Sequence, residues 1–181
     1  MNQSIENEVA IFGGGCFWCT EAFFTELKGV QSIAPGYIGG EVVNPTYEAV
    51  CTGTTGHAEA VKIEFNPAEI SYELLLEVFF ATHDPTTLNR QGNDRGTQYR
   101  SEIFYTNNQQ KQLAGAYIEF LTQEQAFPDP IVTKITEATT YYVAENYHHN
   151  YYSGNKEQGY CSFVITPKLE KFKKIYSDIL K

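Results

Sequence analysis

Short apolar blocks separated by polar residues predict alternating strands and helices in the first half of the chain. The apolar run over residues 8–13 leads into consecutive glycines, which is typical of a buried strand that enters a tight turn. A helix ending near Gly29 should follow, because side chains suited to a core recur at helical spacing at Cys16, Cys19, Phe23 and Leu27. Both cysteines therefore lie near the N-terminus of that helix.

The next blocks extend the pattern in the order of a known motif. Residues 30–37 predict a second strand, and apolar residues alternate with Lys and Glu over 61–65 as in a half-buried third strand. Ser71 can cap a helix that ends before Asp84, and a strand over 102–105 follows. The order β-α-β-β-α-β is that of the split βαβ motif, so we expect an α+β fold with a two-layer, ferredoxin-like core.

Beyond this core the pattern predicts an irregular C-terminal extension. A helix is expected around residues 113–121, a strand over 131–137 and a terminal helix around 169–179. Two stretches lack a clear period: 86–100, which is rich in Gly, Asn and Asp, and 141–161, which is dense in Tyr, His and Asn. Long irregular segments in a compact domain are often functional.

The composition is that of one folded domain, which we expect to span residues 1–181. Apolar residues make up 42% and aromatic residues 14%, enough for a core and an aromatic-walled pocket. The formal charge of −9 repels a phosphate backbone, which argues against a nucleic-acid partner. The first ten residues lack a targeting pattern and no run is long enough to span a bilayer, so we expect a soluble, cytoplasmic protein without a membrane partner.

Cysteines are the main candidates for chemistry. The four of them, Cys16, Cys19, Cys51 and Cys161, are too few to form a disulfide scaffold in a chain of this length. Near a helix N-terminus, Cys16 would face unpaired N–H groups and the positive end of the helix dipole, which favour the thiolate. Redox chemistry is one interpretation of the Cys-x-x-Cys spacing, and a small buried hydrophobic residue is the other. The glycines before Cys16 favour close approach of a ligand, although a tight turn alone would also explain them.

Two other kinds of site are compatible with the cysteine pair. Zinc could bind Cys16 and Cys19 together with two of the histidines at positions 57, 83, 148 and 149. The histidines lack the usual spacing of a second ligand pair, so zinc is the weaker alternative. A thioredoxin-like oxidoreductase would also place Cys-Phe-Trp-Cys after a strand, at the start of a helix.

Several longer sequences favour one function over these alternatives. They are GCFWC at 15–19, NPTY at 44–47, TGHAE at 55–59, HDP at 83–85 and QGNDRGTQYRS at 91–101. Together, and in this order, they resemble the peptide methionine sulfoxide reductase A family. The resemblance resumes at Tyr147-His148 and Gly159-Tyr160-Cys161, so it covers most of the chain.

The resemblance implies an enzyme that reduces the S epimer of methionine sulfoxide, free or in proteins, without metal or organic cofactor. It implies that Cys16 is the nucleophile and Glu59 the acid. This role for Glu59 is chemically reasonable, because the sulfoxide sulfur is electrophilic only when its oxygen is stabilised or protonated. Glu59 should then have a raised pKa, whereas an ordinary surface carboxylate is the alternative reading of this residue.

The resemblance also implies the residues that bind the substrate. The polar groups that hold the sulfoxide would be Tyr47, Asp94 and Tyr99. The wall that holds the methyl group would be formed by Phe17 and Trp18.

Regeneration of the nucleophile needs a second thiol. Attack on the sulfoxide would leave Cys16 as a sulfenic acid. The resemblance implies that Cys161 recycles it through a disulfide, which an external dithiol such as thioredoxin then reduces; a buried structural cysteine is the alternative for Cys161. Many relatives have Gly at the position of Cys19, which leaves two readings of this residue. It is either an alternative resolving thiol or a spectator, and its place three residues along the helix from Cys16 favours the spectator. Cys51 is expected to be structural.

Overall fold

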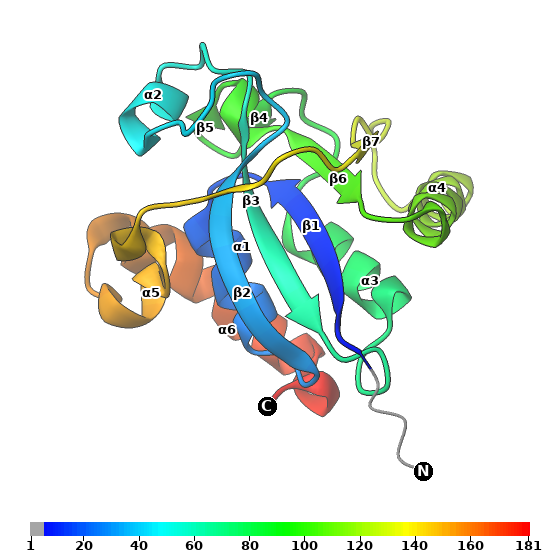
Figure 1. Ribbon diagram of the computed structural model, residues 1–181. Coiled ribbons are helices and arrows are strands. Elements are labelled where there is room, and N and C mark those ends of the chain that lie inside the picture. Colours follow the sequence, from blue (N-terminus) through cyan, green and yellow to red (C-terminus); the bar gives the residue numbers. More distant parts are fainter. Residues whose placement is uncertain (1–5) are drawn as a thin grey trace.

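The computed structural model describes residues 6–181 and contains one central sheet (Figure 1). Its strands are β1 (Glu8–Gly14), β2 (Val30–Ile38), β3 (Ala58–Phe65), β6 (Ser101–Tyr105), β7 (Lys134–Glu137) and β8 (Tyr142–Val143). The order across the sheet is β7-β6-β1-β3-β2-β8. Every neighbouring pair is antiparallel except β6 and β7, which are parallel. The fold is therefore mixed α+β with a mostly antiparallel sheet, which confirms the predicted fold class at this level.

Three helices cover one face of the sheet and lie behind it in Figure 1. They are α1 (Phe17–Thr25), α3 (Tyr72–Thr82) and α6 (Thr166–Ile175). A fourth helix, α4 (Asn108–Gln123), contacts α3, β6 and β7 near the sheet edge. The start of α3 follows the sequence prediction, because the Ser71 hydroxyl accepts the Leu74 N–H at 3.1 Å and caps the first turn.

The main core fills the space between the sheet and these helices. Its centre is aromatic: Phe12 of β1 and Phe79 of α3 stack with ring centroids 4.8 Å apart and planes at 14°. Each such ring buries about 150–250 Å² when it leaves water, so the aromatic content of the chain supplies much of the packing area. Helix α1 is buried along most of its length in this core, which places the residues at its N-terminus inside the protein.

An extended segment, rather than a helix, covers part of the opposite face of the sheet. Residues 138–145 cross this face in front of the strands in Figure 1. Tyr141 from this segment donates its hydroxyl to the carbonyls of Ala34 and Ala60 and packs on a small apolar cluster that includes Phe104. The segment therefore fixes the route by which the C-terminal part of the chain returns to α1.

The structure departs from the sequence prediction at several element ends. Helix α1 ends at Thr25, and Gly29, with φ of 90°, lies in the turn into β2 instead of capping the helix. Strand β3 begins at Ala58, three residues earlier than expected, because its first residues pair with the end of β2. The predicted strand over 131–137 begins only at Lys134, where its ladder with β6 starts.

The two stretches without a clear period contain short ordered elements. Residues 86–100 hold the hairpin of β4 (Arg90–Gln91) and β5 (Asp94–Arg95), followed by a 3₁₀ turn over Thr97–Tyr99. The later stretch contains β8, a 3₁₀ turn over Asn146–His148 and the short helix α5 (Tyr151–Gly154), which contacts α1.

A further short helix, α2 (Tyr47–Cys51), lies in the loop before β3 and was not predicted from the sequence. Among the helices of residues 6–181, none combines the length and the apolar character needed to cross a membrane.

Candidate active site

Cys16 lies between β1 and α1, at the N-cap of the helix. Gly15 has φ of 95°, and a Cβ at this position would lie 2.6 Å from the Gln91 side chain, so the turn requires glycine. The Cys16 carbonyl accepts the Cys19 N–H at 3.1 Å and begins the first helical turn. The predicted strand, glycine turn and helix are all present, and they hold the half-buried Cys16 side chain at the helix N-terminus.

The environment of Cys16 favours the thiol over the thiolate. Burial raises the pKa of Cys16 well above its usual value, and the neighbouring Glu59 and Cys19 add to this, whereas the Trp18 N–H has the opposite effect. The expectation that the helix terminus favours the thiolate is therefore wrong for this structure, because burial costs more than one backbone N–H contributes.

Glu59 is a buried acid next to this thiol. It lies on β3 opposite Tyr37 of β2, and its side chain is only 1% exposed. One carboxyl oxygen accepts the Phe17 N–H at 3.1 Å, and the other has no hydrogen-bond partner among the described residues. Burial raises the pKa of Glu59 to about 8, against the effect of the Phe17 N–H. Glu59 is thus mainly a neutral carboxylic acid at pH 7, and the surface-carboxylate reading is excluded.

Two tyrosines that the resemblance implies for sulfoxide binding lie near Glu59. Tyr47 is the first residue of α2, and Tyr99 ends the 3₁₀ turn after the β4-β5 hairpin. Burial raises the pKa of both phenols, and the nearby Glu59 contributes to each shift. Both hydroxyls therefore stay protonated and can donate hydrogen bonds close to the acid.

Asp94 reaches Cys16 from another side. Its carboxylate accepts the Tyr160 hydroxyl at 2.8 Å. It lines a cavity of about 210 Å³ together with Cys16, Cys19 and Tyr160. Glu59 and the two tyrosines do not line this cavity. Asp94 therefore borders the cavity next to Cys16, whereas the acid and the two tyrosines lie outside it.

The two residues expected to hold a methyl group have different surroundings. Phe17 is 1% exposed and packs among Tyr37, Tyr47 and His148. Trp18 is half-buried, and its ring stacks on Tyr151 of α5 with centroids 3.8 Å apart and planes at 9°. The C-terminal segment thus covers one face of the Trp18 ring.

His148 belongs to one of the family motifs, but the only role expected for it was that of a possible zinc ligand. It is fully buried, and its Nδ1 accepts the Trp18 indole N–H at 3.0 Å. Burial lowers the pKa of His148, so the ring is neutral and carries its proton on Nε2. That Nε2 has no partner among the described residues. His148 therefore orients the indole of Trp18 while keeping a donor unpaired inside the site.

Glu145 is a site residue that was not identified from the sequence. It accepts the Tyr37 hydroxyl at 2.9 Å and the Tyr47 backbone N–H at 2.9 Å, so it joins β2 to the start of α2. The available signal was the density of Tyr, His and Asn over 141–161, which marked the segment but no individual residue.

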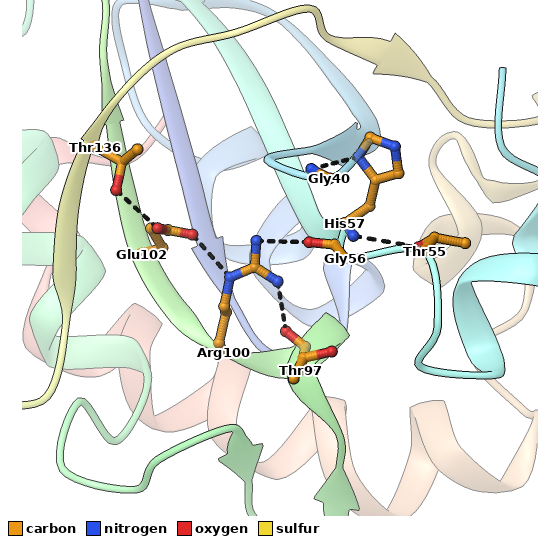
Figure 2. Close-up of polar contacts among 8 residues, drawn as sticks. All are labelled: Gly40, Thr55, Gly56, His57, Thr97, Arg100, Glu102 and Thr136. Atoms are coloured by element: carbon orange, nitrogen blue, oxygen red, sulfur yellow. Dashed lines mark hydrogen bonds and ion pairs between the residues drawn. The ribbon is translucent and has the colours of Figure 1, made fainter. Parts of the chain in front are cut away.

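Arg100 fixes the loop that carries Tyr99 (Figure 2). Its guanidinium donates to Glu102 at 2.8 Å and to the carbonyls of Thr97 and Gly56 at 2.9 Å each. Gly56 lies just before β3, the strand of Glu59. This cluster therefore holds the 3₁₀ turn of Tyr99 against the beginning of the strand that carries the acid.

The histidines proposed as zinc ligands are engaged in other contacts. His83 uses both ring nitrogens, on the Phe79 carbonyl and the Ser101 hydroxyl, and His57 contacts Gly40 N–H and the Val42 carbonyl. Within residues 6–181, no cluster of three or more His, Cys, Asp or Glu side chains has the arrangement of a metal site.

The remaining cysteines lie at different depths. Burial raises the pKa of Cys19 to about 11, Lys168 opposes this shift, and Cys161 is among the neighbours that add to it. Cys161 is fully buried. Cys51, which was expected to be structural, is exposed at the end of α2, and its thiol hydrogen-bonds the Tyr47 side chain.

Comparison with known proteins shows the family of this chain. A family model described as "Peptide methionine sulfoxide reductase" matches residues 8–179. Peptide methionine sulfoxide reductase MsrA of Deinococcus radiodurans is 58% identical over 96% of this chain and 84% of that protein. Among solved structures, reduced Mxr1 from Saccharomyces cerevisiae is 34% identical with a TM-score of 0.78, covering 88% of this chain and 91% of Mxr1. Methionine sulfoxide reductase A of Corynebacterium diphtheriae is 32% identical with a TM-score of 0.74, covering 90% and 81%. With a buried neutral acid beside a cysteine and a family match over nearly its whole length, the chain belongs to the peptide methionine sulfoxide reductase family.

Proposed function

We propose that this chain reduces methionine S-sulfoxide, free or within proteins, with Cys16 as the nucleophile and Glu59 as the acid. The observation that carries the proposal is the hydrogen bond from the Phe17 N–H to Glu59. Because Phe17 directly follows Cys16, this bond holds a neutral carboxylic acid against the backbone next to the nucleophile. A protonated acid can donate to the sulfoxide oxygen, which makes the sulfur electrophilic.

The reaction transfers one oxygen atom and two electrons. As the Cys16 sulfur attacks the sulfoxide sulfur, Glu59 donates its proton to the sulfoxide oxygen and takes up the proton of the thiol. The sulfur–oxygen bond of the substrate then breaks, methionine leaves, and Cys16 keeps the oxygen as a sulfenic acid. Because thiol and acid both start neutral, the buried site carries no extra charge before substrate arrives.

The other site residues would position the sulfoxide. Tyr47 and Tyr99 are assigned as donors to its oxygen, since their phenols remain protonated near Glu59. Asp94, which lines the cavity at Cys16, is assigned with them to the polar groups that hold the sulfoxide. The methyl group is assigned to Phe17 and Trp18, and we expect Tyr151 to shift from the indole when substrate binds, because it covers that ring.

Cys161 is proposed to resolve the sulfenic acid, giving a disulfide with Cys16 and releasing water. Thioredoxin, which supplies two thiols, is proposed as the electron donor. Cys19 is a neighbour of both cysteines. Its thiol raises the pKa of Cys16, and Cys161 raises the pKa of Cys19. Cys19 is therefore kept as the alternative resolving thiol.

We also propose that residues 1–181 form one catalytic domain around a two-layer, ferredoxin-like core. The strand order β6-β1-β3-β2 supports it, with α1 between β1 and β2 and α3 between β3 and β6. A cytoplasmic location stays a prediction from the sequence.

Separate assays of the two methionine sulfoxide epimers, with dithiothreitol as reductant, test the proposed function. We expect reduction of the S epimer only. The thioredoxin-like alternative predicts efficient reduction of insulin disulfides instead. Insulin reduction together with no reaction of either epimer would overturn the proposal.

A further inference from the structure

The side chain of Glu145 ties the short helix α2 to the central sheet. One carboxyl oxygen accepts the Tyr37 hydroxyl and the other accepts the Tyr47 N–H, each at 2.9 Å. Tyr37 lies on β2 and is fully buried, whereas Tyr47 is the first residue of α2. The two bonds therefore hold a residue of the proposed sulfoxide site against a fixed point of the core.

The backbone that carries Glu145 is fixed by the sheet. The preceding strand β8 pairs with β2, so that Tyr142 lies opposite Tyr37. The N–H of the buried Ala144 extends this contact, because it donates to the Pro35 carbonyl at 2.8 Å. Glu145 thus extends from an ordered edge of the sheet, and a group that positions another residue needs such rigid support.

Helix α2 has weak support from other elements and lies away from the three helices that cover the sheet (Figure 1). It is five residues long, and the buried residue among them is Val50. The Gln98 amide donates to the Cys51 carbonyl at the long distance of 3.4 Å. The Tyr47 hydroxyl bonds to the Cys51 thiol, which belongs to the same helix and therefore does not anchor it. The start of α2 thus depends on Glu145 for a short polar contact with the sheet.

The turn that follows Glu145 packs on the ring of Tyr47. Glu145 directly precedes the 3₁₀ turn over Asn146–His148, and the centroids of the His148 and Tyr47 rings are 4.4 Å apart. Glu145 therefore fixes the main chain of Tyr47 while His148 contacts its ring. The Tyr47 hydroxyl held in this way lies close enough to Glu59 for that acid to contribute to its raised pKa.

Glu145 meets its two donors as a carboxylate. Burial would raise the pKa of Glu145, but the hydrogen bonds, chiefly that from the Tyr47 N–H, outweigh burial and lower the pKa below its usual value. The ion pairs within residues 6–181 do not include Glu145. Hydrogen bonds to a charged acceptor are roughly twice as strong as neutral ones. The charge of Glu145 therefore strengthens its bonds to Tyr47 and Tyr37.

We propose that Glu145 is a positioning residue for the reductase step, which holds the Tyr47 hydroxyl where it can donate to the sulfoxide oxygen together with Glu59. The inference rests on the proposed function and adds to it a residue that acts without touching the substrate. Because Glu145 acts through Tyr47, its contribution to the rate exists only while residue 47 has a hydroxyl.

The test measures single-turnover reduction of N-acetyl-methionine S-sulfoxide amide at saturating substrate. Glu145→Ala removes both bonds and should slow the reaction by about tenfold, since a catalytic group displaced by a remote mutation can cost up to about 10²-fold. Glu145→Gln keeps a carbonyl for the Tyr47 N–H but loses the charge, so it should slow the reaction by only about threefold. Glu48→Ala removes the same charge from α2, at an exposed residue that neither donor contacts, and should match the wild type.

A double-mutant cycle with Tyr47→Phe distinguishes positioning from general structural support. Tyr47→Phe removes the hydroxyl but keeps the backbone N–H that Glu145 binds. In the Tyr47→Phe enzyme, we expect Glu145→Ala to change the rate by less than about twofold, which is the error with which independent effects add. Equal slowing by Glu145→Ala in both backgrounds would mean that Glu145 acts through another group, and it would overturn the inference. A wild-type rate in Glu145→Ala would overturn it as well.

Urea unfolding shows whether each variant is folded under the assay conditions. If Glu145→Ala does not fold, the same cycle with Glu145→Gln decides, because a slowing of about threefold should disappear in the Tyr47→Phe background. Failure of the proposed function gives different results. An absence of reduction by the wild type would contradict that function itself, and a full rate in Tyr47→Phe would remove Tyr47 from the site and the inference with it.

Discussion

The backbone N–H of Phe17 donates to the carboxyl of Glu59 at 3.1 Å across 42 positions of sequence. This one bond joins the helix that begins after Cys16 to the strand that carries the acid. Because the donor is a backbone group next to the nucleophile, the acid is positioned by the turn itself and not by a side chain of Phe17. The second carboxyl oxygen is buried and has no partner within residues 6–181, so it is available to a substrate oxygen.

Cys16→Ser should abolish reduction of methionine S-sulfoxide. A serine hydroxyl is almost fully protonated near neutral pH and is a far poorer nucleophile than sulfur. Single-turnover formation of methionine measures the step, and Cys161→Ser, which removes a buried thiol but keeps Cys16 and Glu59, is the matched control. Persistent turnover by Cys16→Ser would exclude Cys16 as the nucleophile.

Glu59→Gln should slow methionine formation by about 10²- to 10⁴-fold, the usual contribution of general acid catalysis. Glutamine keeps the carbonyl that accepts the Phe17 N–H but has no acidic proton. A single-turnover assay isolates this step from recycling. An unchanged rate in the variant would exclude Glu59 as the proton donor.

Glu59 should also make stability depend on pH. Its pKa of about 8 lies above the usual value of 4.5, so the folded protein holds this proton more tightly than the unfolded chain. The resulting stabilisation is complete below about pH 4.5 and is lost as pH rises through 8, a change of roughly 3–5 kcal/mol. Buried Glu21, with a pKa of about 7, acts in the same direction, whereas burial lowers the pKa of His83 to about 4 and destabilises the fold in acid.

The contribution of Glu59 can be separated by comparing wild type with Glu59→Gln in urea unfolding between about pH 5 and pH 9. Glu21 and His83 are present in both proteins, so their effects cancel in the difference. We expect the stability of wild type relative to the variant to decrease steadily with rising pH. A difference that does not change with pH would mean that Glu59 is ionised in the folded state.

Cys161→Ser should separate the reductase step from recycling. The variant keeps Cys16 and Glu59, so one equivalent of methionine should form per enzyme, and thioredoxin-driven turnover should then stop. Dimedone should trap the sulfenic acid on Cys16 in this variant. If full turnover continues and mass spectrometry finds a disulfide between Cys16 and Cys19, the resolving role belongs to Cys19.

The stacking of Tyr151 on Trp18 can be followed directly, because Trp18 is the single tryptophan of the chain. Tyr151→Leu should expose the indole, shift its emission to longer wavelength and increase quenching by acrylamide. Tyr152→Leu is the matched control on the same helix, since Tyr152 bonds to Thr166 instead. Identical spectra for both variants would show that Tyr151 does not cover Trp18 in solution.

The sequence by itself determined the parts of this protein that depend on nearby residues. The run into the glycines, the cap at Ser71 and the alternation over 61–65 act within one turn or one strand, and the structure contains these elements. The position of Cys16 at a helix N-terminus follows from the same local signals, and the ordered set of motifs led to the family.

Only the tertiary structure decided which groups are buried and what they contact. His148 meets Trp18 across 130 positions, and Glu145 meets Tyr47 across 98, so no local pattern could indicate either contact. The protonation of Cys16 and Glu59 also depends on packing, because desolvation is set by every element around a group. For that reason the helix position of Cys16 suggested a thiolate, whereas the assembled core favours the thiol.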